Sequence, residues 1–213
     1  MRQSAIGFYS KKLELEGIIA SPQDPGAREV PAVIACHSHP MLGGNMNDPV
    51  VTAVCQTAVR EGMIALRFNF RGVGDSQGDF TNGKDEHNDI KSALNVMRHW
   101  PAVHGGRVAL VGYSTGATII LDGLRHLRRA AALVLVTPTL GALRSRRFNR
   151  DKRPRLVIAG SDDRVSPSLE IQRILDECRG PVQFHEVVGA DHSMRGYHAE
   201  AAEVAADFLK RNL

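Results

Sequence analysis

The chain has few cysteines, few aromatic residues and no long apolar run. Its 213 residues contain three cysteines, Cys36, Cys55 and Cys178, an odd number without metal-ligand spacing. We interpret them as reduced thiols, which are typical of cytoplasmic proteins. No apolar run approaches the roughly 20 residues of a membrane-spanning helix, and residues 1–7 lack the apolar core of a signal peptide. The sequence therefore predicts a cytoplasmic protein with no membrane span.

Motifs for nucleic-acid binding are also lacking. The net charge is +4, but there is no helix-turn-helix, zinc or RNA-binding signature, so we expect no nucleic-acid partner. Much of the positive charge lies in one segment, residues 144–155. We interpret this segment as a solvated loop. An alternative hypothesis is that Arg146 and Arg147 bind an anionic group of the substrate, such as a carboxylate or the phosphates of coenzyme A.

Short apolar runs alternate with amphipathic stretches along the whole chain. This alternation predicts a single α/β domain over residues 1–213, with a mostly parallel sheet of about 7–8 strands and helices on both faces. Pro22, Pro25 and Gly26 predict a loop at residues 21–29. The expected strands are 6–10, 13–20, 30–35, 63–70, 107–111, 132–136, 156–159 and 182–188, and the expected helices are 48–61, 85–99, 117–124, 167–178 and 197–212.

The most informative motif is Gly112-Tyr113-Ser114-Thr115-Gly116, which reads Gly-x-Ser-x-Gly between a predicted strand and a predicted helix. This context is that of a nucleophile elbow, a sharp turn that exposes the serine hydroxyl. We expect Gly112 and Gly116 to be required because a Cβ at either position would collide where the strand and helix backbones converge. The turn also places Ser114 at a helix N-terminus, which favours developing negative charge. Ser114 is the candidate nucleophile.

A serine nucleophile needs a base and an orienting carboxylate, which follow it in the order acid, then histidine. Two adjacent aspartates, Asp162 and Asp163, lie in the loop after the predicted strand 156–159. The spacing Gly-x-x-Asp-x-x-x-Pro selects Asp163, and we expect Asp162 to support the loop.

Three histidines follow this acid. His185 lies inside the last predicted strand and His198 in the last predicted helix, so we expect structural or surface roles for both. His192 lies in the loop just after that strand, where an imidazole can reach Ser114. We assign His192 as the base. Its neighbour Asp191 is a poor candidate for orienting it, because adjacent side chains on a tight loop rarely face each other.

An oxyanion hole needs two N–H donors. We expect one from Thr115, the residue after the nucleophile, and one from His39 in the loop after strand 30–35, with Met41 as an alternative, since Pro40 has no N–H. His37 and His39 form an i, i+2 pair, but without nearby carboxylate ligands this is weak evidence for a metal site. We therefore predict no metal.

These motifs resemble those of the α/β-hydrolase superfamily over nearly the whole chain. The stretches His37-Ser38-His39-Pro40 and Arg67-Phe68-Asn69-Phe70-Arg71-Gly72-Val73-Gly74 are similar to those of a bacterial group of small, capless hydrolases near the dienelactone-hydrolase and serine-aminopeptidase-like branches. The resemblance implies Ser114, Asp163 and His192 as the catalytic triad. Asn45, Asn69 and Arg71 match the group pattern, and we expect turn and loop-locking roles for them. Residues 138–154 leave no room for a helical cap, so we expect an open, shallow pocket.

We conclude from the sequence that this is a serine hydrolase that cleaves small carboxylic esters or thioesters through an acyl-enzyme, without a cofactor. A peptidase, a lactone hydrolase or a C–C bond hydrolase could use the same triad. A non-catalytic binding protein on the same scaffold is the alternative from another class. The sequence leaves the acyl chain, the leaving group and the oligomeric state open.

Overall fold

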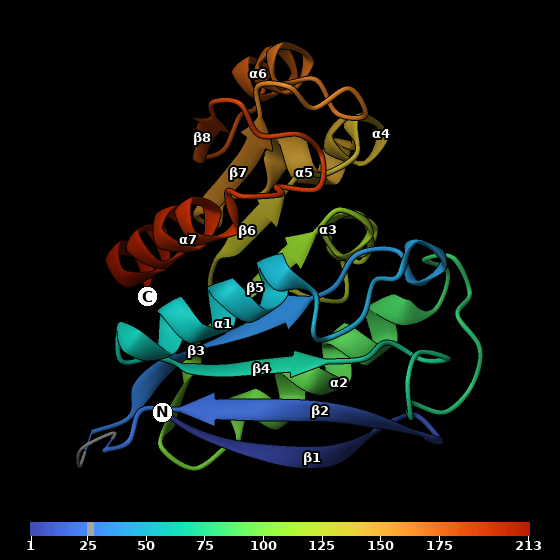
Figure 1. Ribbon diagram of the computed structural model, residues 1–213, viewed down its shortest axis with the longest axis vertical. Coiled ribbons are helices and arrows are strands. Elements are labelled where there is room, and N and C mark those ends of the chain that lie inside the picture. The colour runs from blue at the N-terminus through green and yellow to red at the C-terminus, as the bar shows by residue number, and fades with distance from the viewer. Residues whose placement is uncertain (25–27) are drawn as a thin grey trace.

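The computed structural model describes residues 1–24 and 28–213, so Pro25 and Gly26 of the predicted loop lie outside the described residues. Eight strands form one sheet in the order β1-β2-β4-β3-β5-β6-β7-β8 (Figure 1). Only β1 and β2 run antiparallel to their neighbours, and the other six strands are parallel. The strands are β1 (Arg2–Ser10), β2 (Leu13–Ser21), β3 (Val30–Cys36), β4 (Ile64–Phe68), β5 (Val103–Tyr113), β6 (Leu133–Val136), β7 (Arg155–Gly160) and β8 (Val182–Val187). The predicted fold class is confirmed.

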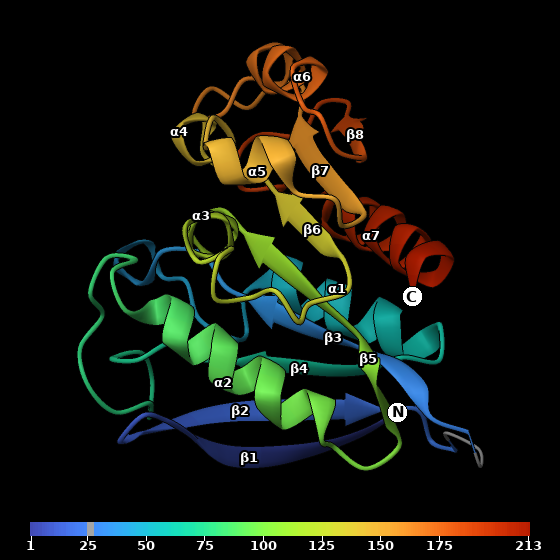
Figure 2. The ribbon, with the colours of Figure 1, turned by 180° about the vertical axis from the view of Figure 1, so that it is seen from behind.

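Helices cover both faces of this sheet. One face carries α1 (Pro49–Arg60) and α7 (His198–Asn212), which lie in front in Figure 1. The other face carries α2 (Glu86–Arg98), α3 (Thr115–Asp122), α4 (Leu140–Leu143), α5 (Arg146–Arg150) and α6 (Ser168–Asp176), as Figure 2 shows from behind. The 3₁₀ turn η1 (Pro40–Leu42) follows β3. Each face has its own apolar cluster, because the parallel strands are buried on both sides.

The local sequence explains where the helices begin. The Asp48 carboxylate accepts a hydrogen bond from the N–H of Val50 (3.2 Å), and Pro49 occupies the first helical position of α1. In α2, the side chains of Ile90, Leu94 and Met97 are buried on one face, as their spacing predicts. No helix among the described residues is long and apolar enough to cross a membrane.

The predicted boundaries differ from the structure at two places that matter for the site. The elbow strand β5 is longer than predicted, because it begins at Val103 and ends at Tyr113, directly before Ser114. The connection after β6 contains α4 and α5, which were not predicted. Helices of one turn show no repeat of apolar residues long enough to be recognised. The connection remains too short for a cap, as predicted.

Candidate active site

Ser114 lies at the turn between β5 and α3 with φ 50° and ψ −109°, a conformation that non-glycine residues rarely adopt. A Cβ on Gly112 would lie 2.5 Å from the Cα of Ala117 in α3, as predicted. A Cβ on Gly116 would instead collide with the carbonyl oxygen of Cys36 and lie 2.7 Å from that of His37. The reason predicted for Gly116 is therefore corrected: this glycine lets α3 approach the end of β3, not its own preceding strand.

Three predicted residues form one chain of hydrogen bonds. The Oγ of Ser114 lies 3.0 Å from Nε2 of His192, and Nδ1 of His192 lies 2.8 Å from Oδ2 of Asp163. Asp163 comes from the loop after β7 and His192 from the loop after β8. The carboxyl ends of parallel strands meet at one edge of the sheet, which brings these distant segments together.

The surroundings of Asp163 fix its carboxylate. Its Oδ1 accepts hydrogen bonds from the N–H groups of Val165 and Ser166, both at 2.8 Å, and its side chain is fully buried. Asp162 is exposed, and its N–H donates to the carbonyl of Ala190 (3.0 Å). The structure therefore brings Asp163 to the imidazole, while Asp162 links its loop to the loop after β8.

The other candidate groups lie elsewhere. Nε2 of His185 lies 3.7 Å from a carboxylate oxygen of Glu200, and His198 is the first residue of α7. The Asp191 carboxylate accepts hydrogen bonds from the hydroxyl (2.6 Å) and the N–H (2.9 Å) of Ser193, and the hydroxyl bond is the main cause of its lowered pKa. Asp191 therefore holds the turn after His192 and does not orient the imidazole.

Tyr113 is a site residue that the sequence analysis missed. Its hydroxyl donates a hydrogen bond to the backbone carbonyl of His192 (3.3 Å), and the side chain lines the same pocket as Ser114. Burial raises the pKa of Tyr113, with the carboxylates of Asp48 and Asp191 adding to the effect. The phenol therefore remains a neutral donor that holds the histidine loop. The position of Tyr113 directly before Ser114 in the motif could have indicated that it lies at the site.

Among the described residues, the two backbone amides predicted to form the oxyanion hole have no hydrogen-bond partner of their own. Within the described part of the chain, the N–H groups of Thr115 and His39 donate no hydrogen bond. The N–H of Met41, the alternative donor, is occupied because it donates to Nδ1 of His39 (3.2 Å). The geometry thus leaves Thr115 and His39, at the start of α3 and the end of the β3 loop, free to donate.

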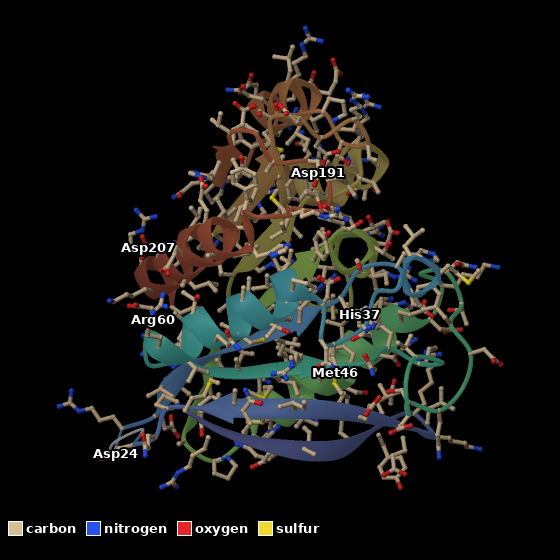
Figure 3. The ribbon with its side chains drawn as sticks, viewed as in Figure 1. Asp24, His37, Met46, Arg60, Asp191 and Asp207 are labelled. Atoms are coloured by element: carbon tan, nitrogen blue, oxygen red, sulfur yellow. The ribbon has the colours of Figure 1, made fainter. Side chains whose placement is uncertain are left out.

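The side chain of His37 fixes the loop after β3. Its Nδ1 lies 2.7 Å from the carbonyl of Ser38, and its Nε2 accepts a hydrogen bond from the N–H of Phe70 (3.1 Å). Burial lowers its pKa from 6.5 to about 4, so the ring is neutral at ordinary pH. Figure 3 labels His37 near the end of β3 and Asp191 in the loop after β8. Among residues 1–24 and 28–213, no group of three or more potential ligands could hold a metal ion.

Ser38, in the loop after β3, connects this loop to the start of α1. The hydroxyl of Ser38 donates a hydrogen bond to Oδ2 of Asp48 (2.7 Å), whose other oxygen caps α1. Burial raises the pKa of Asp48, and the hydrogen bond from Ser38 opposes that shift. The loop that carries His39 is therefore tied to the N-terminus of α1.

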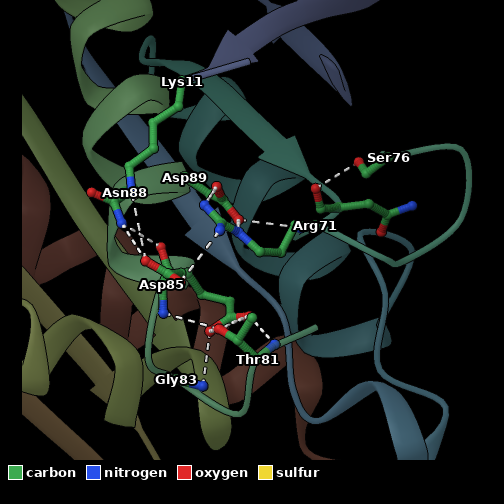
Figure 4. A network of polar contacts seen from close by, with 10 residues as sticks. Lys11, Arg71, Ser76, Thr81, Gly83, Asp85, Asn88 and Asp89 are labelled. Carbon is green, nitrogen blue, oxygen red and sulfur yellow. Dashed lines mark hydrogen bonds and ion pairs between the residues drawn. The ribbon is translucent and has the colours of Figure 1, made fainter. Parts of the chain in front are cut away.

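Asn69 and Arg71 lock neighbouring loops, as predicted. Asn69 accepts a hydrogen bond from the N–H of Met46 (2.7 Å) and donates one to Glu16 (2.6 Å). Arg71 forms two side-chain hydrogen bonds with Asp89 of α2, at 3.0 and 2.7 Å, which Figure 4 shows. These bonds raise the pKa of Arg71. For Asn45, the amide donates to the carbonyl of Gly43 (3.0 Å), a turn contact.

A pocket of about 1220 Å³ opens over Ser114. Leu42 and Val165 line it with 87% and 63% of their surfaces exposed, and Met41 beside them is 85% exposed. None of residues 144–155 lines this pocket. The basic segment thus lies outside the walls of the pocket over Ser114.

Comparisons with known proteins agree with this fold. The profile described as X-Pro dipeptidyl-peptidase (S15 family) matches residues 13–148. An α/β serine hydrolase homologue from Coxiella burnetii superposes with a TM-score of 0.84 and 31% identity over 97% of both chains. XC6422 from Xanthomonas campestris, described as a serine hydrolase without lid, has a TM-score of 0.84 and 23% identity over 99% of this chain and 95% of its own. Protein RP471 of Rickettsia prowazekii is 26% identical over 96% of this chain and 87% of its own length.

Fold, site and comparisons together define an α/β-type serine hydrolase without a cap. Within this class, the chain belongs to the X-Pro dipeptidyl-peptidase (S15) family.

Proposed function

We propose that this hydrolase cleaves small carboxylic esters or thioesters, with Ser114, His192 and Asp163 as its catalytic triad. The observation that carries the proposal is the pair of hydrogen bonds that joins Ser114 Oγ to His192 (3.0 Å) and His192 to Asp163 (2.8 Å). Asp163 keeps the Nδ1 proton on the imidazole, so Nε2 is the nitrogen that accepts the serine proton.

Acylation begins when Ser114 Oγ attacks the substrate carbonyl carbon and passes its proton to His192 Nε2. The carbonyl oxygen becomes an oxyanion, which the free N–H groups of Thr115 and His39 stabilise. The tetrahedral intermediate collapses when the bond to the leaving alcohol or thiol breaks. His192 then donates its proton to the leaving group, and the acyl group remains on Ser114.

Deacylation repeats these steps with water. His192 takes a proton from the water, whose oxygen attacks the acyl carbon. The Ser114 ester bond then breaks, the proton returns to Ser114, and the carboxylic acid leaves. Every step uses side chains and backbone amides of this chain and one water molecule, so the reaction requires no cofactor.

The mouth of the pocket favours an apolar acyl group. Leu42 and Val165 line the pocket over Ser114 and are largely exposed, and exposed apolar side chains in a pocket are typical of sites that bind apolar ligands. An acyl chain that covered these side chains would remove them from water. AidA of Acinetobacter baumannii, described as a quorum-quenching protein, is 24% identical over 91% of this chain and 63% of its own length.

A dipeptidyl-peptidase activity is the second candidate. Its support is the family profile together with two exposed carboxylates, Asp162 and Asp191, which line the pocket and could pair with a peptide α-amino group. Each of them already accepts a hydrogen bond from a neighbouring serine. Because both carboxylates already accept hydrogen bonds, and because exposed apolar side chains line the pocket, we favour the ester over the peptide as substrate.

Kinetics on two chromogenic substrates separate the candidates. We expect the purified chain to hydrolyse p-nitrophenyl butyrate, and Ser114→Ala to abolish the activity. Alanyl-prolyl-p-nitroanilide should be hydrolysed with a lower kcat/KM. A higher kcat/KM for the anilide, which is the chemically harder bond, would assign the site to peptides and reject the ester proposal. Hydrolysis of the ester by Ser114→Ala at the wild-type rate would reject the triad.

A further inference from the structure

A second hollow, of about 1090 Å³, lies between the segment after α3 and the short helix α5. Both elements lie on the sheet face that Figure 2 shows. Its lining has no residue in common with that of the pocket over Ser114. Six basic side chains from three segments surround it: Arg125, Arg128, Arg146, Arg147, Arg150 and Lys152. We call these six residues the arginine pocket.

The arginine pocket has no internal counter-charge. A further lining residue, Arg153, pairs with the one acidic residue in the wall, Asp151, at 2.5 Å. Across the ranges that the structure describes, none of the six residues of the arginine pocket forms an ion pair. Gathering uncompensated like charges opposes folding. A bound anion would relieve this repulsion.

Packing around the hollow fixes the position of α5 and its basic side chains, and these side chains make the electrostatic potential at the site positive. Arg155, beside the pocket, stacks over the ring of Phe148 of α5, with 4.5 Å between the guanidinium carbon and the ring centroid. Phe148 is fully buried, so α5 holds its arginines against a fixed anchor. In the neighbouring hollow, partial desolvation and then the charges of nearby groups, Arg125 and Arg147 among them, lower the pKa of His126.

We propose that the arginine pocket binds a compact polyphosphate, of the class that includes inorganic tripolyphosphate and nucleoside triphosphates. Guanidinium groups bind phosphate oxygens through two parallel hydrogen bonds, and five of the six side chains are arginines. A ligand with several negative charges in a small volume can contact both walls at once. A single carboxylate would leave most of the six cations unpaired.

A second basic hollow beside the arginine pocket allows a compact ligand to be distinguished from a longer polyanion. A neighbouring hollow shares Arg125 and Arg128 with the arginine pocket and adds Lys91 and Arg129. A nucleic-acid strand would follow both hollows, because its phosphates are spaced along a chain. A compact polyphosphate needs only the arginine pocket. Substitutions in the second hollow therefore distinguish the two ligands.

The experiment measures binding of inorganic tripolyphosphate and of ATP to the full chain by calorimetry at an ionic strength of about 0.15 M, where charges more than about 8 Å apart are largely screened. We expect both to bind, and we expect the double variant R146Q/R147Q to weaken the affinity at least about tenfold, which corresponds to about 1.4 kcal/mol. The matched control R2Q/K12Q removes the same charge from exposed positions outside both hollows and should stay within about twofold. The variant K91Q/R129Q should also stay within about twofold, because long-range charge is screened.

Several results would overturn the proposal. They are the absence of binding, and equal weakening by R146Q/R147Q and R2Q/K12Q, which would indicate unspecific attraction. Tighter binding of single-stranded DNA that K91Q/R129Q also weakens would assign the surface to nucleic acid. Binding to phosphatidylglycerol vesicles without binding to either soluble polyphosphate would assign it to a membrane. All substituted side chains are exposed, and a cooperative thermal unfolding transition without ligand, at or above the wild-type temperature, confirms that the variants are folded.

Discussion

Oδ2 of Asp163 lies 2.8 Å from Nδ1 of His192, although the two residues come from loops after different strands. The other carboxylate oxygen of Asp163 is held by two backbone N–H groups. The carboxylate is therefore held with Oδ2 directed at the imidazole. Because this oxygen accepts a hydrogen bond, Nδ1 of His192 carries the proton. The opposite ring nitrogen, Nε2, lies 3.0 Å from Ser114 Oγ, as the proposed proton transfer requires.

Asp163→Asn should nearly abolish ester hydrolysis while leaving the fold intact. The amide can donate to Nδ1, which stabilises the tautomer whose Nε2 carries the proton and cannot accept one. We expect kcat to fall by about 10⁴. Asp162→Asn is the matched control, and its kcat should stay within about twofold, because Asp162 is exposed and does not contact the imidazole. An equal loss in both variants would reject the assignment of Asp163.

Gly116→Ala should destabilise the protein, although alanine normally stabilises a helix relative to glycine. The new Cβ would collide with the carbonyl oxygens of Cys36 and His37, which are backbone atoms that cannot rotate away. We expect the free energy of unfolding to fall by at least about 2 kcal/mol, as measured by urea denaturation. Gly141→Ala in α4 is the control, because nothing lies within 4 Å of its Cβ position. Equal effects of the two substitutions would contradict the close approach of α3 to β3.

Because the pKa of His37 is lowered in the folded state, we expect the free energy of unfolding to fall in mild acid. Its pKa is about 4 in the folded state against 6.5 in the unfolded state. The unfolded chain therefore binds a proton first as the pH falls, so the contribution is complete above pH 6.5 and is lost as the pH falls to about 4. The shift corresponds to roughly 3 kcal/mol. Urea denaturation between these pH values should show a smaller pH dependence for His37→Gln than for the wild type. Parallel curves would show that His37 does not carry the effect.

The buried pair of Arg71 and Asp89 should matter far more than an exposed pair. Asp89→Ala removes both side-chain hydrogen bonds of the Arg71 guanidinium, which is only 7% exposed, and leaves it the 4.0 Å ion pair with Asp85. We expect a loss of about 3 kcal/mol in the free energy of unfolding. Glu203→Ala breaks the pair with Arg60, whose side chains are 60% and 52% exposed, and should cost less than about 1 kcal/mol. Similar losses would contradict the role assigned to the network in Figure 4.

The sequence predicted a mostly parallel sheet and the three residues that hydrogen bonds join at Ser114. Features with a cause in the local sequence could be predicted. These are the need for a small residue at Gly112, the helix cap at Asp48, and the spacing that distinguishes Asp163 from Asp162. The helices α4 and α5 were missed because one helical turn carries no periodic signal. Short elements depend on tertiary contacts that no local pattern encodes.

Contacts between distant segments explain the remaining differences. Nothing local to Gly116 indicates that the end of β3 packs against it, and nothing local to Ser38 indicates its bond to Asp48. The bond from Tyr113 to the His192 carbonyl likewise joins loops that are far apart in the chain. Such pairings follow from the order of the strands, which the alternation of elements leaves undetermined.

The central claim is that His192 activates Ser114. The most direct measurement is labelling with a fluorophosphonate probe, followed by mass spectrometry of the labelled peptide. The account predicts a label on Ser114 alone, no label in Ser114→Ala, and labelling of His192→Ala slower by at least about 10². Modification of another residue, or an unchanged labelling rate in folded His192→Ala, would contradict it.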